Sequence, residues 1–159
     1  MPNPKASIII TTHNRPHLLP RAVESARAAG SNVEIVVVDD ASVDETAGVC
    51  QRLSGINYVR VERNQRVAGA RNIGLVASRG EYLSFLDDDD ARLADSLDMQ
   101  IEMLEREPSA GLIYGRAIFA DQDGTPGYFA CAAHAPAPGF PRHRGLTRTG
   151  PCLVWPKAG

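Results

Sequence analysis

Four consecutive aspartates at positions 87–90 are the residues of this sequence most suited to chemistry. Adjacent carboxylates repel one another, and a hard divalent cation relieves that repulsion because Mg²⁺, Mn²⁺ and Ca²⁺ prefer carboxylate oxygens as ligands. In a D-x-D pattern, one carboxylate can reach a metal while a neighbour accepts a hydrogen bond from a sugar hydroxyl. The same run also fits a solvated acidic turn that favours the N-terminus of the following helix. On these residues alone, both interpretations stay open.

A second acidic pair, Asp39 and Asp40, follows the apolar run at residues 33–38. A carboxylate at this position could accept hydrogen bonds from a nucleotide base or a ribose. Asp40 or Ser42 could instead cap the helix that follows, because short polar side chains accept hydrogen bonds from the first free N–H groups of a helix. Taken alone, this pair favours the capping interpretation.

Polar residues also follow the first apolar run, in the segment TTHNRP at residues 11–16. Their side chains and free backbone groups could contact a nucleotide. Equally, Asn14 could form an Asx turn while Pro16 prepares the next helix. We expect no zinc site at His13, since Pro16 interrupts any regular helix between it and His17.

Three arginines, Arg63, Arg66 and Arg71, cluster after the third predicted strand. Guanidinium groups suit phosphate recognition because they donate paired hydrogen bonds, although Arg63 fits ordinary surface charge better. The region contains neither the P-loop pattern nor the glycine pattern of dinucleotide-binding folds.

The elements that must position these residues alternate between strand-like and helix-like patterns up to about residue 120. Short apolar runs predict strands at residues 7–11, 33–38, 58–61, 82–86 and 112–120. The alternation predicts an α/β fold with a mostly parallel sheet flanked by helices. Ligands of such sheets bind beyond the carboxyl ends of the strands, so the polar clusters at 12–14, 39–40 and 87–90 should share one edge.

The helices between these strands carry their own signals. The stripe of the first helix consists of Leu19, Ala22, Val23 and Ala26, with Pro20 limited to its first turn. A capping box of Ser42 and Glu45 predicts a second helix, and residues 67–78 predict a third. The stripe of the fourth consists of Leu93, Leu97, Ile101 and Leu104. Residues 121–124 (DQDG) predict a turn that begins a hairpin.

Composition excludes several classes of protein. The 159 residues carry a formal net charge of −2 and are 43% hydrophobic, as in soluble globular domains. This balance argues against a nucleic-acid partner, which usually requires a basic face. The longest aliphatic runs fall far short of the ~20 residues of a membrane-spanning helix. No secretory signal is visible, and three widely spaced cysteines fit reduced thiols, so we expect a cytoplasmic protein.

The chain divides into two parts of different composition. Residues 1–123 hold all 19 acidic residues and resemble a packed domain. Residues 124–159 hold none and are rich in glycine and proline, which is typical of loops or of an incomplete element.

Three blocks taken in order resemble a known family. SIIITTHNRP, EIVVVDDASVDET and ERNQRVAGARNIGLVASRGEYLSFLDDDD resemble the amino-terminal half of family 2 glycosyltransferases, over about residues 6–114. The resemblance implies a Rossmann-like GT-A fold and a sugar transferred, with inversion, from a nucleotide diphosphate donor that is most often UDP-linked. The acceptor, whether a sugar, a lipid or a protein, stays open, and so does peripheral contact with a membrane.

The resemblance also implies roles for single residues. Thr11, His13 and Asn14 belong to the nucleotide-binding block, with Thr11 and His13 lining the base pocket. Asp40 contacts the base, Arg66 or Arg71 lies near the base or diphosphate, and Asp88 contacts the donor ribose. The metal ligands for Mn²⁺ or Mg²⁺ are Asp87 and Asp89. Asp90 is held in reserve because four aspartates leave the D-x-D register open by one residue.

Inverting transfer needs a general base that deprotonates the acceptor hydroxyl. The last acidic residue here is Asp123. We therefore expect the base to lie beyond Gly159, and the carboxy-terminal acceptor part to be missing. Residues 150–155 resemble the strand before that part, and Asp121 or Asp123 is a weak substitute for the base. Two alternatives remain: a non-catalytic nucleotide-binding module, and a receiver-like signalling domain, which also ends a strand in paired aspartates but needs a further lysine.

Overall fold

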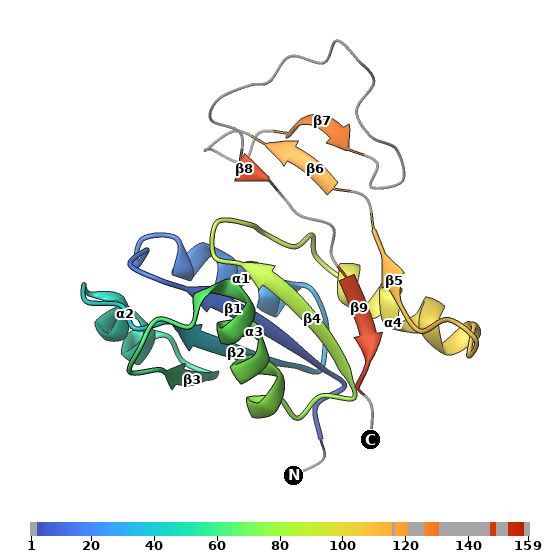
Figure 1. Cartoon of the computed structure of the whole chain (residues 1–159). Helices are drawn as coiled ribbons and strands as arrows, with labels where there is room; N and C mark the ends of the chain where they lie inside the picture. Colours follow the sequence, from blue (N-terminus) through green and yellow to red (C-terminus); the bar gives the residue numbers. More distant parts are fainter. Residues whose placement is uncertain (1–2, 116, 121–125, 131–146, 149–152, 158–159) are drawn as a thin grey trace.

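The computed structural model describes residues 3–115, 117–120, 126–130, 147–148 and 153–157. Its helices and strands alternate through the first 115 residues (Figure 1). The strands are β1 (Ala6–Thr12), β2 (Val33–Asp39), β3 (Ile56–Arg60), β4 (Tyr82–Asp87), β5 (Ile113–Tyr114), β6 (Ala117–Ala120), β7 (Pro126–Ala130), β8 (Thr147–Arg148) and β9 (Leu153–Pro156). The helices are α1 (Leu19–Ala28), α2 (Thr46–Arg52), α3 (Arg66–Ala77) and α4 (Ser96–Arg106).

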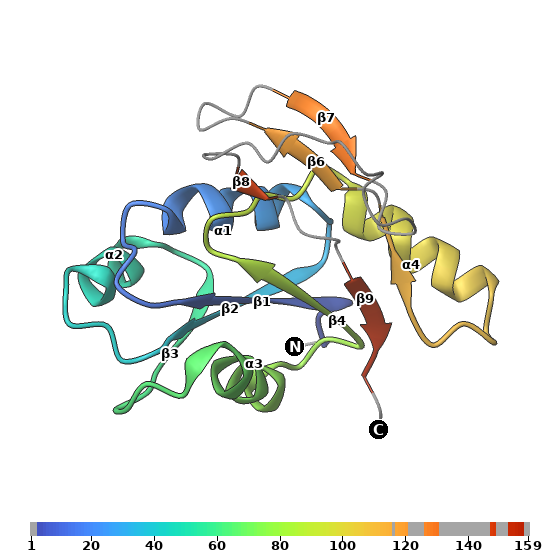
Figure 2. The same ribbon diagram turned by 45° about the horizontal axis from the view of Figure 1, so that its top comes forward.

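The main sheet has six strands in the order β3-β2-β1-β4-β9-β5. The strands β3, β2, β1 and β4 are parallel, and β9 pairs antiparallel with both β4 and β5. A separate three-stranded sheet has the order β7-β6-β8. It lies beyond the end toward which β4 points in both views (Figures 1 and 2). The predicted α/β fold with a mostly parallel sheet is confirmed.

Helices cover both faces of the sheet, which explains the runs of consecutive apolar residues in its central strands, such as 8–10 in β1 and 35–38 in β2. Successive side chains of a strand point to opposite faces. On one face, Ile8 and Ile10 of β1 pack with α1, α2 and α4. On the other, Ile9 packs with residues of α3. Figure 2 shows α3 on one side of the sheet and α1 on the other. The buried stripe of α1 is Leu19, Ala22, Val23 and Ala26, as predicted.

Two glycines permit close packing. A Cβ at Gly74 of α3 would lie 2.2 Å from Cγ2 of Ile9, so the helix approaches β1 closely only because no side chain intervenes. A Cβ at Gly80, just before β4, would lie 2.4 Å from the backbone of Ala6. No helix among the described residues is long and apolar enough to cross a membrane.

Three local predictions were wrong. The helix expected to begin at Ser42 begins instead at Thr46, because the Asp44 carboxylate, not Ser42, accepts hydrogen bonds from the Thr46 backbone and hydroxyl. Leu93 precedes α4 and is exposed. The single strand expected at residues 112–120 is two strands, β5 and β6, in different sheets. The predicted turn at 121–124 lies outside the described residues, although β6 and β7 pair as a hairpin does.

Candidate functional site

The carboxyl ends of β1, β2 and β4 meet in a pocket of about 350 Å³. This edge holds all three polar clusters, as the parallel sheet predicts. The register pairs Thr11 with Asp87 and Thr12 with Asp39, so the three strand ends lie level with one another. The pocket is lined by Thr11, Thr12, His13, Arg15, Asp40, Val67, Ala70, Asp87, Asp88 and Asp89.

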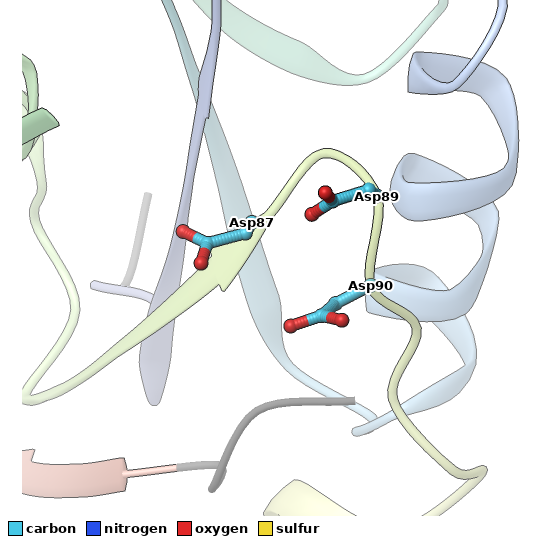
Figure 3. Close-up of side chains that lie close together, drawn as sticks. All are labelled: Asp87, Asp89 and Asp90. Carbon is cyan, nitrogen blue, oxygen red and sulfur yellow. The ribbon is translucent and has the colours of Figure 1, made fainter. Parts of the chain in front are cut away.

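Three of the four consecutive aspartates form a compact acidic cluster. Asp87 ends β4, and its carbonyl accepts a hydrogen bond from the Asp90 amide at 3.0 Å, which turns the chain. Oxygens of Asp87, Asp89 and Asp90 lie within 4.8 Å of one another (Figure 3). Asp87 and Asp89 are about half exposed, whereas Asp90 is buried. Three hard oxygen donors at this spacing fit a divalent cation such as Mg²⁺ or Mn²⁺.

Asp88 has different surroundings from its three neighbours. It is only 4% exposed, and its Oδ2 accepts a hydrogen bond from the Thr12 hydroxyl at 2.7 Å. Its Oδ1 accepts a hydrogen bond from Nη1 of Arg15 at 3.1 Å. Burial raises the pKa of the Asp88 carboxyl above its usual value, although the Thr12 and Arg15 donors oppose that shift. Asp88 is thus a fixed part of the pocket wall.

Arginines partner the two exposed carboxylates. Nη2 of Arg71 lies 2.6 Å from Oδ1 of Asp87, and its guanidinium stacks 5.0 Å from the ring centre of Phe85. Nη1 of Arg15 lies 3.2 Å from Oδ2 of Asp89. The cluster is therefore balanced by positive charge from α3 and from the β1–α1 connection.

Asp40 joins the end of β2 to the start of α3. The Oδ1 atom of Asp40 accepts a hydrogen bond from the backbone N–H of Gln65 at 2.6 Å, and Asp40 is 4% exposed. His13 Nδ1 donates to the Asp40 carbonyl at 2.6 Å. The capping interpretation is thus wrong for Asp40, since its carboxylate binds the N-terminus of α3 and not that of α2. Asp39 faces inward and accepts hydrogen bonds from Ser42 and Tyr58.

Three predicted site residues do not line the pocket: Arg71, which pairs with Asp87 as described above, Asn14 and Arg66. Asn14 has a φ of 54° and connects two loops. Its backbone N–H donates a hydrogen bond to the Ser42 hydroxyl, and its side-chain Oδ1 accepts one from the Val43 backbone N–H. Arg66 begins α3 with a φ of 59°, and its amide donates to Asn64 Oδ1. Asn14 and Arg66 shape the loops beside the pocket.

From the sequence, Thr12 and Arg15 belong to the polar segment 11–16, but neither has a predicted role of its own. Strand alternation could have indicated Thr12, because it ends β1 beside β4 and a buried hydroxyl there needs a partner. No sequence signal distinguishes Arg15, whose partners lie 73 and 74 positions away.

Comparison with known proteins identifies what this arrangement is similar to. The family described as Glycosyl transferase family 2 matches residues 7–147. An uncharacterized glycosyltransferase of Haemophilus influenzae is 33% identical over 109 residues, which is 68% of this chain and 37% of that protein. The Bacillus subtilis protein TuaG, a putative teichuronic acid biosynthesis glycosyltransferase, is 33% identical over 77% of this chain and 50% of its own length.

Solved structures agree. Residues 1–349 of S. aureus TarS, in complex with UDP, match with a TM-score of 0.58 and 25% identity, over 68% of this chain and 34% of that fragment. A mannosyltransferase of Pyrobaculum calidifontis, solved with GDP-Man and Mn²⁺, matches in fold with a TM-score of 0.61 and 24% identity, over 70% of this chain and 35% of that protein. The chain thus spans between about a third and a half of the length of these proteins.

Proposed function

This chain belongs to glycosyltransferase family 2 and has the GT-A fold of that family, and from this premise we propose that its pocket binds the nucleotide diphosphate of a sugar donor, with UDP the preferred nucleotide. In this proposal residues 1–123 form the donor-binding domain, and residues 124–159 belong to the acceptor side. The transfer to the acceptor inverts the anomeric carbon.

One observation carries the proposal: Asp87 and Asp89 of the acidic cluster line the same pocket, at the carboxyl edge of the sheet, as the polar residues Thr11, His13 and Asp40. Thr11 and His13, which line the pocket with Asp40, are assigned to the base. Because Asp40 Oδ1 is engaged by Gln65, its second oxygen is assigned to an N–H group of the base. Asp88, which also lines the pocket, is assigned to the ribose.

Asp87 and Asp89 are assigned to a divalent cation, Mn²⁺ or Mg²⁺, with Asp90 beside them. When bound, such an ion acts as a Lewis acid that stabilises charge developing on the leaving diphosphate. Arg71, held against Asp87 and Phe85, adds positive charge at the same end of the pocket. Thr12 and Arg15 keep Asp88 in place for the ribose.

No general base is assigned among the described residues. Asp121 and Asp123, the last acidic residues of the chain, lie outside them. The proposal therefore rests on donor binding. A module that binds the nucleotide without turnover would give the same binding results, and metal-dependent hydrolysis of the sugar donor that is lost in Asp89→Ala would distinguish an enzyme from it. Membership of the family replaces the receiver-like interpretation.

Isothermal titration calorimetry tests the proposal. UDP, GDP and dTDP are titrated into the protein with Mn²⁺, with Mg²⁺ and with EDTA. We expect UDP to bind in the presence of a divalent cation and to lose at least tenfold in affinity with EDTA or in Asp89→Asn. Glu102→Gln, which removes an exposed carboxylate from α4, serves as the control and should bind as the wild type does. Absence of binding by all three nucleotides, or binding that ignores both EDTA and Asp89→Asn, would overturn the proposal.

A further inference from the structure

Arg15 pairs with Asp89, so a metal cation would compete with it for that carboxylate. A single nitrogen, Nη1, lies 3.1 Å from Asp88 Oδ1 and 3.2 Å from Asp89 Oδ2. The Arg15 side chain is 50% exposed and lines the pocket. It therefore partly neutralises an oxygen donor of the acidic cluster from the solvent side.

The two contacts of Arg15 differ in strength. Asp89 is 44% exposed, and an ion pair between two exposed side chains contributes little free energy, so a divalent cation can displace it. The Asp88 carboxylate is only 5% exposed, and Thr12 also holds it. A hydrogen bond to a buried carboxylate is more costly to break. Displacement from Asp89 thus leaves Arg15 attached to the pocket wall through Asp88.

From this asymmetry we propose that Arg15 is a positioning residue that shields Asp89 in the metal-free protein and turns to the donor diphosphate once a divalent cation takes its place. This inference rests on the proposed function. A guanidinium carries five N–H donors, so one can remain on Asp88 while others reach phosphate oxygens. Arg15 then couples the binding of the metal to the binding of the nucleotide.

The other two arginines at the cluster are placed differently. Arg71 stacks on Phe85, which itself packs against Trp155 at 5.1 Å between ring centres, so Arg71 is held at the Asp87 end by packing. Arg21 of α1 donates to the main-chain oxygen of Asp89 at 2.8 Å and leaves its carboxylate available. Among the described arginines of the pocket, Arg15 is the one that pairs with a candidate metal ligand and also with Asp88.

The coupling predicts opposite effects on two binding constants in Arg15→Gln. Without nucleotide, Mn²⁺ should bind about two- to fivefold more tightly, because an exposed competing ion pair is gone. With saturating Mn²⁺, UDP should bind at least about tenfold more weakly, because charge-assisted hydrogen bonds to the diphosphate are lost. A residue with only a structural role would weaken both.

The experiment measures Mn²⁺ binding by electron paramagnetic resonance and UDP binding by calorimetry, on the same protein. Arg15→Lys keeps the positive charge but lacks the paired N–H donors of the guanidinium. It should retain wild-type Mn²⁺ affinity and show an intermediate loss of UDP affinity. Arg27→Gln removes one positive charge from the far part of α1, where Arg27 pairs with Glu24, and should change neither constant. Thermal unfolding of each variant checks the fold, and Arg15→Lys carries the test if Arg15→Gln is unfolded.

The outcomes separate this inference from the proposed function. If the wild type binds UDP with Mn²⁺ but Arg15→Gln leaves UDP affinity unchanged, or weakens Mn²⁺ and UDP together, the role of Arg15 is refuted while the proposed function stands. If the wild type binds no nucleotide, both fail. Opposite shifts in the two constants support the inference.

Discussion

The hydrogen bond between Thr12 and Asp88 offers the sharpest test of how the pocket wall is built. Thr12 is 3% exposed and Asp88 is 4% exposed, and the Thr12 hydroxyl donates to Asp88 Oδ2 at 2.7 Å. Thr12→Val keeps the size and β-branching of the side chain and removes the donor. The Asp88 carboxylate then keeps Arg15 but loses its partner on β1.

The expected loss follows from the charge and burial of this pair. A buried hydrogen bond to a charged group contributes about 1.5–3 kcal/mol. For a chain of this length, each kcal/mol lowers the melting temperature by about 2–4 °C. Thr12→Val should therefore melt roughly 3–12 °C below the wild type at pH 7.

The loss should also depend on pH. Burial raises the pKa of the folded Asp88 carboxyl above the 3.8 of an exposed aspartate, so between these two values the folded protein holds more protons than the unfolded chain. Stability contributed by Asp88 consequently falls as pH rises through that window. Removing the Thr12 donor raises the folded pKa further. The difference between Thr12→Val and wild type should thus be largest at pH 7 and shrink toward pH 4.

Urea denaturation followed by circular dichroism at pH 7 and pH 4 measures both effects. Thr11→Val is the matched control: Thr11 is the preceding residue of β1, is partly exposed, and has no side-chain hydrogen bond recorded within the described part of the chain. A loss below about 0.5 kcal/mol at pH 7, the usual range of neutral surface substitutions, would refute the reasoning. A loss that grows as the pH falls would refute it equally.

Two further predictions concern the opposite edge of the sheet. Burial alone would raise the pKa of Glu34, but hydrogen bonds from Ser7 and Arg79 more than offset it and hold the pKa below the usual 4.5. Glu34→Gln should therefore cost about 1–3 kcal/mol at pH 7, and in urea denaturation the difference should vanish as acid protonates the wild-type carboxylate, since a lowered pKa stabilises the fold only above it. A Cβ at Gly80 would lie 2.4 Å from backbone atoms of β1, which cannot move aside as a side-chain end can, so Gly80→Ala should lower the free energy of unfolding by about 1–3 kcal/mol. Gly111→Ala, which meets nothing within 4 Å, should change it far less, and similar losses in the two variants would contradict the packing argument.

The fold and the edge that carries the site were predictable because both depend on patterns local in the sequence. Continuous apolar runs indicated strands buried on both faces, and the polar residues after each run had to share the carboxyl edge. The first run, at residues 7–11, lies within β1, and the run at 82–86 lies within β4. Neither prediction needs a contact between distant residues.

The second helix start was not predictable in this way, because residues distant in sequence compete for the cap. Ser42 and Glu45 have the spacing of a capping box. In the structure the Ser42 hydroxyl instead accepts a hydrogen bond from the Asn14 amide at 2.9 Å, and the Ser42 amide donates to Asp39. Ser42 thus makes hydrogen bonds to two neighbouring loop segments and does not cap the helix, which begins at Thr46.

The four aspartates are alike in sequence but not in surroundings, and the difference follows from their backbone. Asp87 still belongs to β4, so its side chain alternates with that of Leu86. The turn closed by the Asp90 amide then directs Asp89 and Asp90 toward Asp87, while Asp88 meets Thr12 and Arg15. Composition alone cannot distinguish Asp88 from Asp89. Both oxygens of Asp88 accept hydrogen bonds, from Thr12 and Arg15, whereas the Asp89 carboxylate pairs with the exposed Arg15. The turn makes that distinction, and for this reason the proposed metal ligands are Asp87 and Asp89, with Asp90 beside them, and not Asp88.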